Sequence, residues 1–131
     1  MDYILDTHAW IEYFRGSEAG EQVKRAIENT NNRVYTAECS MGELWEWATR
    51  EKHDFERASN IMMAITSFCP IELADWTEAA RIKREIREKH RDFGMMDALI
   101  LCKQRQLGCR LLTGDPHFAG LPGVTIYDMK R

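Results

Sequence analysis

Short apolar runs alternate along the chain with longer stretches in which apolar residues recur every three or four positions. Runs of the first kind predict buried strands, and stretches of the second kind predict helices with one buried face. The expected strands cover residues 3–5, 33–37, 70–74, 110–113 and 124–127. The expected helices follow the first strand at Asp6, cover 18–29, 40–50 and 55–68, open at Asp75 or Thr77, and cover 95–107 before Gly108. Apolar strands between helices predict a three-layer α/β/α domain with a central parallel sheet of about five short strands.

One acidic residue interrupts the most apolar of the expected helices. Asp97 lies in the run MMDALIL, and its neighbours one turn away, Ile100 and Leu101, are apolar. An acid at this position faces the core side of the helix. Burying an ionised carboxylate without a partner costs several kcal/mol, and no lysine or arginine lies within one helical turn. We therefore expect Asp97 to have either a cationic partner or a metal ion.

Three further acids lie near the ends of expected strands, and each has an ordinary structural explanation. Asp6 follows the first strand, where Asp6 or Thr7 can cap the next helix at a gain of roughly 1 kcal/mol. Ser40 and Glu43 have the spacing of a capping box. Asp115 precedes a proline, which suits the first position of a helix.

Topology gives the same acids a shared explanation. In a parallel sheet, Asp6 and Asp115 lie at one edge if their strands are neighbours, and the following helices can present Glu43 and Asp97 above that edge. Four carboxylates at one point repel each other strongly. Such a cluster is tenable at neutral pH only with a divalent metal, and oxygen ligands select Mg²⁺ or Mn²⁺ over zinc.

Charge and composition narrow the choice of partners only slightly. The 131 residues suit a single domain over 1–131, and the net charge of −3 carries no global nucleic-acid signature. One helix face is nevertheless basic. Either it is a solvated, salt-bridged face supported by Glu85 and Lys89, or it contacts phosphate. Its residues are Arg81, Lys83, Arg84, Arg87, Lys89 and Arg91.

Cysteine spacing and the distribution of apolar runs indicate the compartment. The four cysteines form no C-x-x-C pair and are expected to be reduced thiols packed in the core. The chain shows no spanning segment and no signal peptide, so we expect a cytoplasmic protein without a membrane partner. The broad apolar stripe of 55–68, together with Trp45 and Trp47, leaves a protein interface open.

Four segments carry a resemblance to a known family. They are YILDTHAWIEYF at the start, YTAECSMGELWEWA with its S-x-x-E-L, the MMDALIL helix, and LLTGDPHF near the end. In this order and spacing the chain resembles the PIN-domain ribonucleases, and among them the VapC-type toxins of toxin–antitoxin pairs. The resemblance covers nearly the whole chain and implies a PIN-like fold.

The resemblance implies a site, a reaction and partners. Asp6, Glu43, Asp97 and Asp115 would be the catalytic, metal-binding acids, with Thr7, Ser40 and Thr113 as supporting hydroxyl groups. The implied activity is that of a Mg²⁺- or Mn²⁺-dependent endoribonuclease, a hydrolase of RNA phosphodiester bonds. The implied partners are an RNA substrate, a second copy in a homodimer and an antitoxin protein.

Two alternative functions and the role of His8 stay undecided at this point. The chain can be a housekeeping PIN nuclease that processes cellular RNA, or a non-catalytic binding module with the same fold. Retention of all four acids speaks against the second of these. His8 has no assigned role, since it is one residue from Thr7 and could touch substrate phosphate or serve structure alone.

Overall fold

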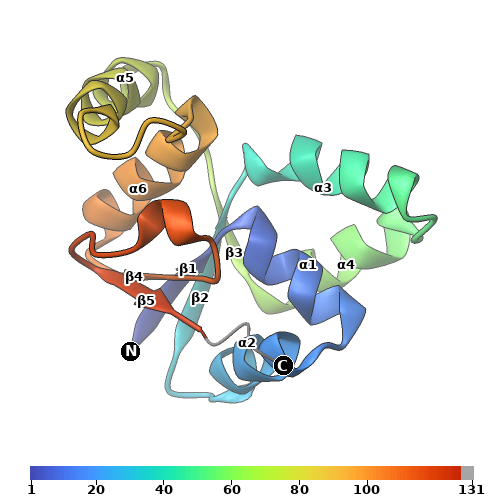
Figure 1. Cartoon of the computed structure of the whole chain (residues 1–131). Coiled ribbons are helices and arrows are strands. Elements are labelled where there is room, and N and C mark those ends of the chain that lie inside the picture. The colour runs from blue at the N-terminus through green and yellow to red at the C-terminus, as the bar shows by residue number, and fades with distance from the viewer. Residues whose placement is uncertain (128–131) are drawn as a thin grey trace.

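The computed structural model describes residues 1–127, which form a parallel five-stranded sheet with helices on both faces (Figure 1). The strands are β1 Asp2–Leu5, β2 Arg33–Ala37, β3 Ser67–Cys69, β4 Arg110–Thr113 and β5 Val124–Ile126. The helices are α1 Thr7–Arg15, α2 Glu18–Glu28, α3 Ser40–Arg50, α4 Phe55–Ile65, α5 Leu73–Arg87 and α6 Met95–Leu107, with a short 3₁₀ helix η1 at Pro116–Phe118. The predicted fold class is confirmed.

The strand order places β1 at the centre of the sheet. The order is β3-β2-β1-β4-β5, and every pairing is parallel. After β1 the chain adds β2 and β3 on one side, and it later returns to add β4 and β5 on the other. In open α/β sheets, ligands bind at the carboxyl ends of the strands where the order reverses in this way. That point lies after Leu5 of β1 and Thr113 of β4.

Two hydrophobic layers hold the helices to the sheet. Ile4 and Leu111 are buried in the layer under α5 and α6, while Leu5 and Leu112 are buried in the layer under α1 to α4. Successive side chains of a strand point to opposite faces, so each apolar strand supplies both layers. In Figure 1 the α5–α6 pair and the group α1 to α4 accordingly lie on opposite sides of the sheet.

The helix after β1 is fixed at both ends. Asp6 caps α1 by accepting a hydrogen bond from the Ala9 backbone, and Gly16 ends it in the left-handed conformation at φ 67°. The helix then packs closely on α2, because a Cβ atom on Gly20 would lie 2.1 Å from the Glu12 carbonyl oxygen. Trp10 Nε1 also donates to Thr36 Oγ1 of β2 at 3.0 Å. These contacts give Asp6 a rigid position at the edge of the sheet.

The prediction was wrong around the third strand. The strand covers Ser67–Cys69 instead of 70–74, and α4 ends at Ile65, so Phe68 belongs to the sheet. Pro70 has no N–H to donate to a sheet, which explains why the strand stops before it. Helix α5 begins at Leu73, earlier than the predicted Asp75 or Thr77, and the Asp75 carboxylate accepts a hydrogen bond from the Glu72 backbone at 2.7 Å.

A buried ion pair joins helices α5 and α6. Lys103 Nζ of α6 lies 2.6 Å from Asp75 Oδ2 of α5, and both side chains are buried. Gln106 Nε2 donates to Asp75 Oδ1, also at 2.6 Å. The hydrogen bond from Lys103 outweighs the effect of burial and lowers the pKa of Asp75 to about 2. Asp75 is therefore an ionised and fully satisfied structural acid.

The remaining expectations on surface and core have mixed outcomes. All four cysteines are free thiols, as predicted. Trp47 is buried under Phe14 and His53 and is no open interface residue, whereas Trp45 is half exposed. Among residues 1–127, no helix has the length and apolar content that crossing a membrane requires.

Candidate active site

Asp6 and Asp115 meet through one hydroxyl group. Thr113 Oγ1 donates to Asp6 Oδ2 at 2.5 Å and accepts a hydrogen bond from the Asp115 backbone N–H at 3.0 Å. The other Asp6 oxygen accepts from the Ala9 N–H at 2.8 Å. The condition that the first strand and the strand before Asp115 be neighbours is met, because β1 and β4 pair directly. Thr113 thus sets the position of one acid on each strand.

Asp97 approaches the same place from α6. It lies in the first turn of the helix, where its Oδ2 accepts a hydrogen bond from the Gly94 N–H at 3.0 Å. Its side chain is 25% exposed, so it lies at the surface end of the helix and not within the core. Asp115 similarly caps η1 by accepting from the His117 N–H at 2.9 Å, and Pro116 occupies the first position of η1 as predicted.

Each of the three aspartates therefore accepts a backbone hydrogen bond at the start of a helix, yet this alone does not explain why they converge. A carboxylate has about four lone-pair sites, and the one or two hydrogen bonds accepted by each of Asp6, Asp97 and Asp115 leave sites free. The structural and the metal-binding explanations are compatible for all three.

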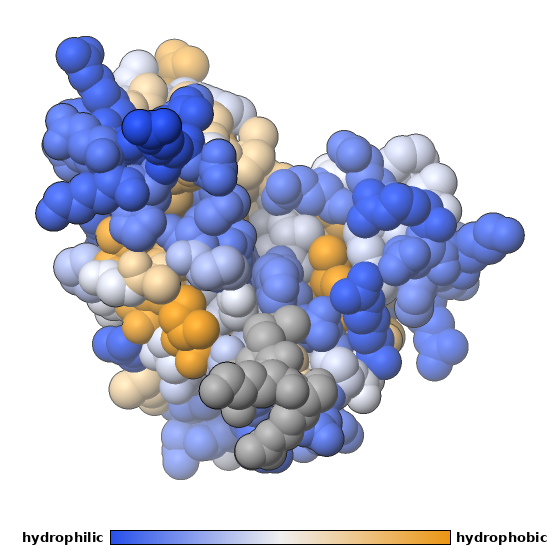
Figure 2. Space-filling model, in the orientation of Figure 1, coloured by the Kyte–Doolittle hydropathy of each residue, from blue (hydrophilic) through white to orange (hydrophobic). Residues whose placement is uncertain are grey.

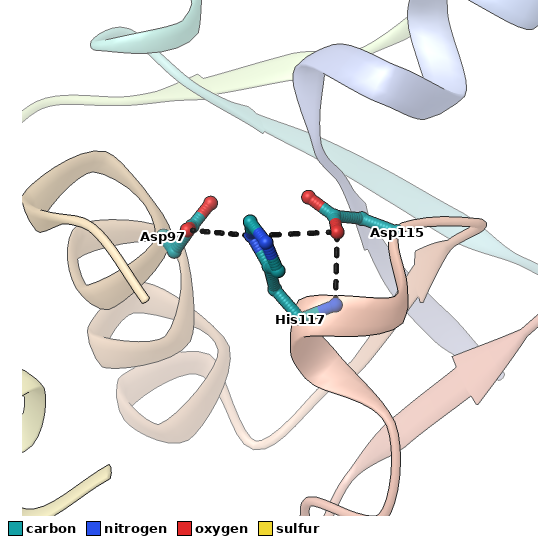
Figure 3. A group of neighbouring side chains, drawn as sticks. All are labelled: Asp97, Asp115 and His117. Carbon is teal, nitrogen blue, oxygen red and sulfur yellow. Dashed lines mark hydrogen bonds and ion pairs between the residues drawn. The ribbon is translucent and has the colours of Figure 1, made fainter. Parts of the chain in front are cut away.

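His117 completes a compact group of ligand atoms that the sequence prediction missed. Its Nδ1 lies 3.6 Å from Asp97 Oδ2 and 3.5 Å from Asp115 Oδ1. Figure 3 shows the imidazole between the two carboxylates. One donor atom from each of the three residues lies within 4.8 Å of the others. The signal in the sequence was the D-x-H spacing within LLTGDPHF, where a histidine two residues after an acid can share its ligand.

Asp6 and Asp97 have the raised pKa values of acids without a lysine or arginine partner. Burial raises the pKa of Asp6 to about 7 against the hydrogen bonds from Thr113 and Ala9, and the charges of Asp115 and Asp97 add to the rise. Burial also raises the pKa of Asp97, with Asp115 adding to it and the Gly94 N–H and His117 opposing it. In the part of the chain that the structure describes, no lysine or arginine forms an ion pair with either acid. These residues fit a divalent cation, whose charge would reverse both shifts.

Glu43 and Thr7 form the other side of the site. Glu43 projects from the first turn of α3, and its Oε1 accepts a hydrogen bond from Thr7 Oγ1 at 2.8 Å. Glu43 and Asp6 fall outside the compact group of Asp97, Asp115 and His117. Glu43 is therefore held by Thr7, the residue that follows Asp6, and is positioned by α1 as well as α3.

The predicted capping box at Ser40 and Glu43 is wrong. Cys39 is the cap residue and already has helical dihedral angles, so Ser40 lies inside the helix. A capping serine needs an extended backbone. The Ser40 hydroxyl is buried and has no hydrogen-bond partner among the residues described. Glu43 is consequently free of the structural role that the sequence pattern favoured.

His8, unassigned from the sequence, has a partner from the end of the sheet. Its Nδ1 lies 2.5 Å from the Tyr127 hydroxyl, a contact between residues 119 positions apart. Gly114 passes directly beside the pair, because a Cβ atom there would lie 2.8 Å from Tyr127 Cζ and 2.9 Å from His8 Cε1. Burial raises the pKa of Tyr127, so its hydroxyl stays protonated. This contact favours a structural role for His8 in fixing the loop before Asp115.

The basic face on and just after α5 has one salt-bridged residue. Arg81 pairs with Glu78 and also with Glu85, at 2.6 Å in the second case, whereas the predicted pair of Glu85 with Lys89 is not formed among the residues described. Figure 2 shows a hydrophilic surface over α5 and a hollow between the α5–α6 side and the α3–α4 side of the molecule. The hollow lies above the carboxyl ends of the central strands seen in Figure 1.

Acidic residues clustered at the switch point of a parallel sheet are the feature to compare with known protein families. The chain matches the family model described as PIN domain over residues 3–124, and it therefore belongs to the PIN-domain family. A search of curated proteins found no match.

Solved structures with the same fold include toxins and toxin–antitoxin complexes. The chain is similar to the Mycobacterium tuberculosis toxin VapC20, described as cleaving the sarcin–ricin loop, with 18% identity, a TM-score of 0.77 and coverage of 96% of this chain and 99% of that one. It is similar to VapBC2 of Rickettsia felis bound to promoter DNA, with 15% identity, a TM-score of 0.73 and coverage of 98% and 100%. It is also similar to a toxin–antitoxin complex from Klebsiella pneumoniae, with 21% identity, a TM-score of 0.69 and coverage of 94% of this chain and 95% of that one. At these identities the likeness establishes the fold.

Proposed function

We propose that the protein is a metal-dependent endoribonuclease and the toxin of a type II toxin–antitoxin pair. The observation that carries the proposal is the convergence of Asp6, Asp97 and Asp115 at the switch point of the sheet, where burial and mutual repulsion raise the pKa of Asp6 and Asp97. Membership of the PIN-domain family supports it. A site that keeps acids together at such a cost is suited to a divalent cation, with Mg²⁺ and Mn²⁺ as the candidates.

The catalytic residues are Asp6, Glu43, Asp97 and Asp115, all of them proposed metal-binding acids. When bound, the metal supplies a more acidic water and a positive charge for the phosphate. Asp97 and Asp115 hold it from α6 and from the loop after β4, and Asp6 from the end of β1. Glu43, kept in place by the Thr7 hydroxyl, accepts a proton or orients a water at the open side of the site.

The supporting hydroxyl groups have distinct tasks. Thr113 holds the Asp6 and Asp115 segments at a fixed separation through its two hydrogen bonds. Thr7 orients Glu43. The Ser40 hydroxyl is fully buried and has no partner among the described residues, so a supporting role for Ser40 would run through a buried water.

Cleavage of a labelled mixed RNA tests the nuclease directly. The reaction is run with Mg²⁺, with Mn²⁺ and with a chelator, using the wild-type protein, the Asp97→Asn variant and the matched control Asp92→Asn. Asp92 is an exposed acid five residues before Asp97. Cutting by wild type and control that needs metal and is lost in Asp97→Asn supports the proposal. Cutting that survives in Asp97→Asn or in the chelator contradicts it.

The toxin assignment rests on the shared fold and on the descriptions of the neighbours, which are toxins or toxin–antitoxin complexes. Its test is growth of a bacterial host. Induced wild-type protein is expected to arrest growth, Asp97→Asn is not, and co-expression of a small protein encoded beside the gene is expected to restore growth. Unimpaired growth with active, folded wild-type enzyme would favour a housekeeping nuclease instead.

A pocket suited to an antitoxin segment lies between α1, α2, α3 and α4. Its volume is about 490 Å³, and its lining combines apolar and aromatic side chains, among them Tyr13, Phe14 and Ile61, with charges of both signs, which are Lys24, Arg57, Glu21 and Asp54. Such a lining fits an apolar side chain flanked by polar or charged groups. Ile61→Asp is expected to weaken inhibition by the antitoxin without changing cleavage by the free enzyme, whereas Glu88→Gln, at an exposed position outside the pocket, is expected to change neither. Equal inhibition of both variants would place the antitoxin elsewhere.

We further propose that the protein is one domain that acts in the cytoplasm as a homodimer. Exposed apolar side chains are available for self-association, with Leu73 88% and Trp76 41% exposed on the first turn of α5. Light scattering of the purified protein tests the dimer. A mass of 15.3 kDa would show a monomer, and twice that mass a dimer.

A further inference from the structure

We propose that His117 is a direct ligand of the divalent ion and that it makes the site favour Mn²⁺ over Mg²⁺, an inference that rests on the proposed nuclease function. The four acids of the site are alike in offering oxygen. His117 is the one nitrogen ligand in the compact group, and no acid-based account of the site uses it.

The distances around the imidazole fit ligands of one ion better than a hydrogen bond. Nδ1 lies 3.6 Å from Asp97 Oδ2 and 3.5 Å from Asp115 Oδ1, beyond the usual N–H···O range. An octahedral ion with ligands at about 2.1 Å places adjacent ligands about 3 Å apart and opposite ligands about 4.2 Å apart. The two observed separations lie between these values. A small contraction around an ion would make all three atoms ligands.

The imidazole is presented by a fixed turn. The His117 backbone N–H donates to Asp115 Oδ1 at 2.9 Å, so the two candidate ligands are held by the same loop. The next residue, Phe118, is fully buried and packs edge-on against Phe93 at 5.6 Å between ring centroids. Both backbone neighbours of His117 are thus anchored, and Figure 3 shows its ring between Asp97 of α6 and Asp115 before η1.

The ring also leaves the site open. The His117 side chain is 40% exposed and the Asp97 and Asp115 side chains are each 25% exposed. Water and a phosphate oxygen can therefore complete the coordination of an ion held by these three residues. A closed structural metal site would leave no such positions.

One nitrogen donor changes which ion the site prefers. Mg²⁺ favours oxygen ligands in a near-ideal octahedron and gives up its waters reluctantly, whereas imidazole suits transition metals. Replacing one oxygen by the His117 nitrogen is thus expected to weaken Mg²⁺ relative to Mn²⁺. Mn²⁺ retains enough affinity for carboxylates to use Asp97 and Asp115 as well.

The test measures metal binding by the full-length protein, without RNA. Mn²⁺ and Mg²⁺ affinities are determined by calorimetry for wild type, His117→Ala and the control His53→Ala, an exposed histidine between α3 and α4. Pulsed electron paramagnetic resonance of the bound Mn²⁺ reports a directly coordinated ¹⁴N. We expect nitrogen coupling in wild type and in His53→Ala and none in His117→Ala. Mn²⁺ affinity should fall about tenfold or more in His117→Ala, and Mg²⁺ affinity by less.

The outcomes separate this inference from the nuclease proposal. Bound Mn²⁺ without nitrogen coupling in wild type overturns the inference, and this spectrum decides even if the variant fails to fold. Unchanged or tighter Mn²⁺ binding in folded His117→Ala also overturns it. If Asp97→Asn loses both metal and cleavage while His117→Ala keeps both, the nuclease stands and the ligand assignment fails. Wild-type protein that binds no divalent ion and cuts no RNA overturns both.

Discussion

Asp6 and Asp75 are both buried aspartates, and their surroundings shift their pKa values in opposite directions. Asp75 lies between α5 and α6, where Lys103 and Gln106 hold its two oxygens and lower its pKa to about 2. Asp6 lies at the switch point of the sheet, where burial and two further aspartates raise its pKa to about 7. Asp6 accepts hydrogen bonds at 2.8 Å from Ala9 and 2.5 Å from Thr113, so what it lacks is a positively charged partner.

The contrast between these two pKa shifts indicates how a candidate functional acid can be recognised in this fold. Burial alone does not mark it, since both carboxylates are about equally buried. The mark is burial combined with nearby like charges and without a fixed cation. Asp75 stabilises the α5–α6 pair on which Asp97 is carried, whereas Asp6 and Asp97 have no lysine or arginine partner among the described residues.

The largest expected effect comes from neutralising the unpaired acid. Asp6→Asn is expected to lower RNA cleavage about a thousandfold or more, the size of effect found when a group that stabilises transition-state charge is removed. Its melting temperature without metal should stay within a few degrees of wild type, because the change also removes a repelled buried charge. Single-turnover cleavage and thermal unfolding measure the two quantities. A strongly destabilised but active variant would reverse the roles assigned to Asp6 and Asp75.

Breaking the paired acid should have the reverse signature. Lys103→Met leaves the Asp75 carboxylate buried and unpaired, which is expected to lower the free energy of unfolding by about 3 kcal/mol. Cleavage per folded molecule should be nearly unchanged. The control is the double variant Asp75→Asn/Lys103→Met, which should recover most of the stability in urea unfolding. A double variant as unstable as the single one would show that the charge pair is not the cause.

Acid should weaken the Asp75 pair only at low pH. Since the pKa of Asp75 is about 2 in the folded protein and near 3.8 when free, the unfolded chain binds more protons between these values. The stabilisation is therefore full above about pH 4 and is lost as the pH falls toward 2. Urea unfolding of wild type across this range should show a decline that is shallower in Asp75→Asn/Lys103→Met. Identical slopes would mean that Asp75 is not held as a carboxylate by Lys103.

The smallest expected effect is at the link between the two strands. Thr113→Val removes the hydrogen bond to Asp6 and the acceptor for the Asp115 N–H, at a cost of about 1 kcal/mol each or less. We expect a modest loss of stability and a severalfold loss of metal affinity, both measurable by calorimetry. Thr113→Ser keeps the hydroxyl group and serves as the control. Equal metal affinity in Thr113→Val and wild type would separate Thr113 from the site.

The parts of this structure that sequence could predict are those fixed by local periodicity and topology. The apolar runs gave β1, β2 and β4 nearly in full, and the neighbouring positions of β1 and β4 brought Asp6 and Asp115 together as expected. The third strand was misplaced because Pro70 looks like the start of a segment when it in fact ends one. Three residues of strand next to a proline offer too little pattern to decide.

The contacts that sequence missed join residues through space. The pair of His8 and Tyr127 spans 119 positions, and that of Asp75 and Lys103 depends on how α5 lies on α6. Neither has a local signature. His117 has a weak local signature, since it stands two residues after Asp115. A lone exposed histidine is common, however, and only the position of Asp97 across from it marks it as a candidate ligand.

The most direct test of the account is the anomalous scattering of Mn²⁺ in crystals of the wild-type protein. The account predicts a peak in contact with Asp97 and Asp115, within reach of Asp6, with ligand distances of about 2.1–2.3 Å. The same crystals of Asp97→Asn should show no peak there. A site that stays empty at Mn²⁺ concentrations sufficient for cleavage, or a peak remote from these aspartates, would contradict the central claim that the three acids converge in order to bind the catalytic metal.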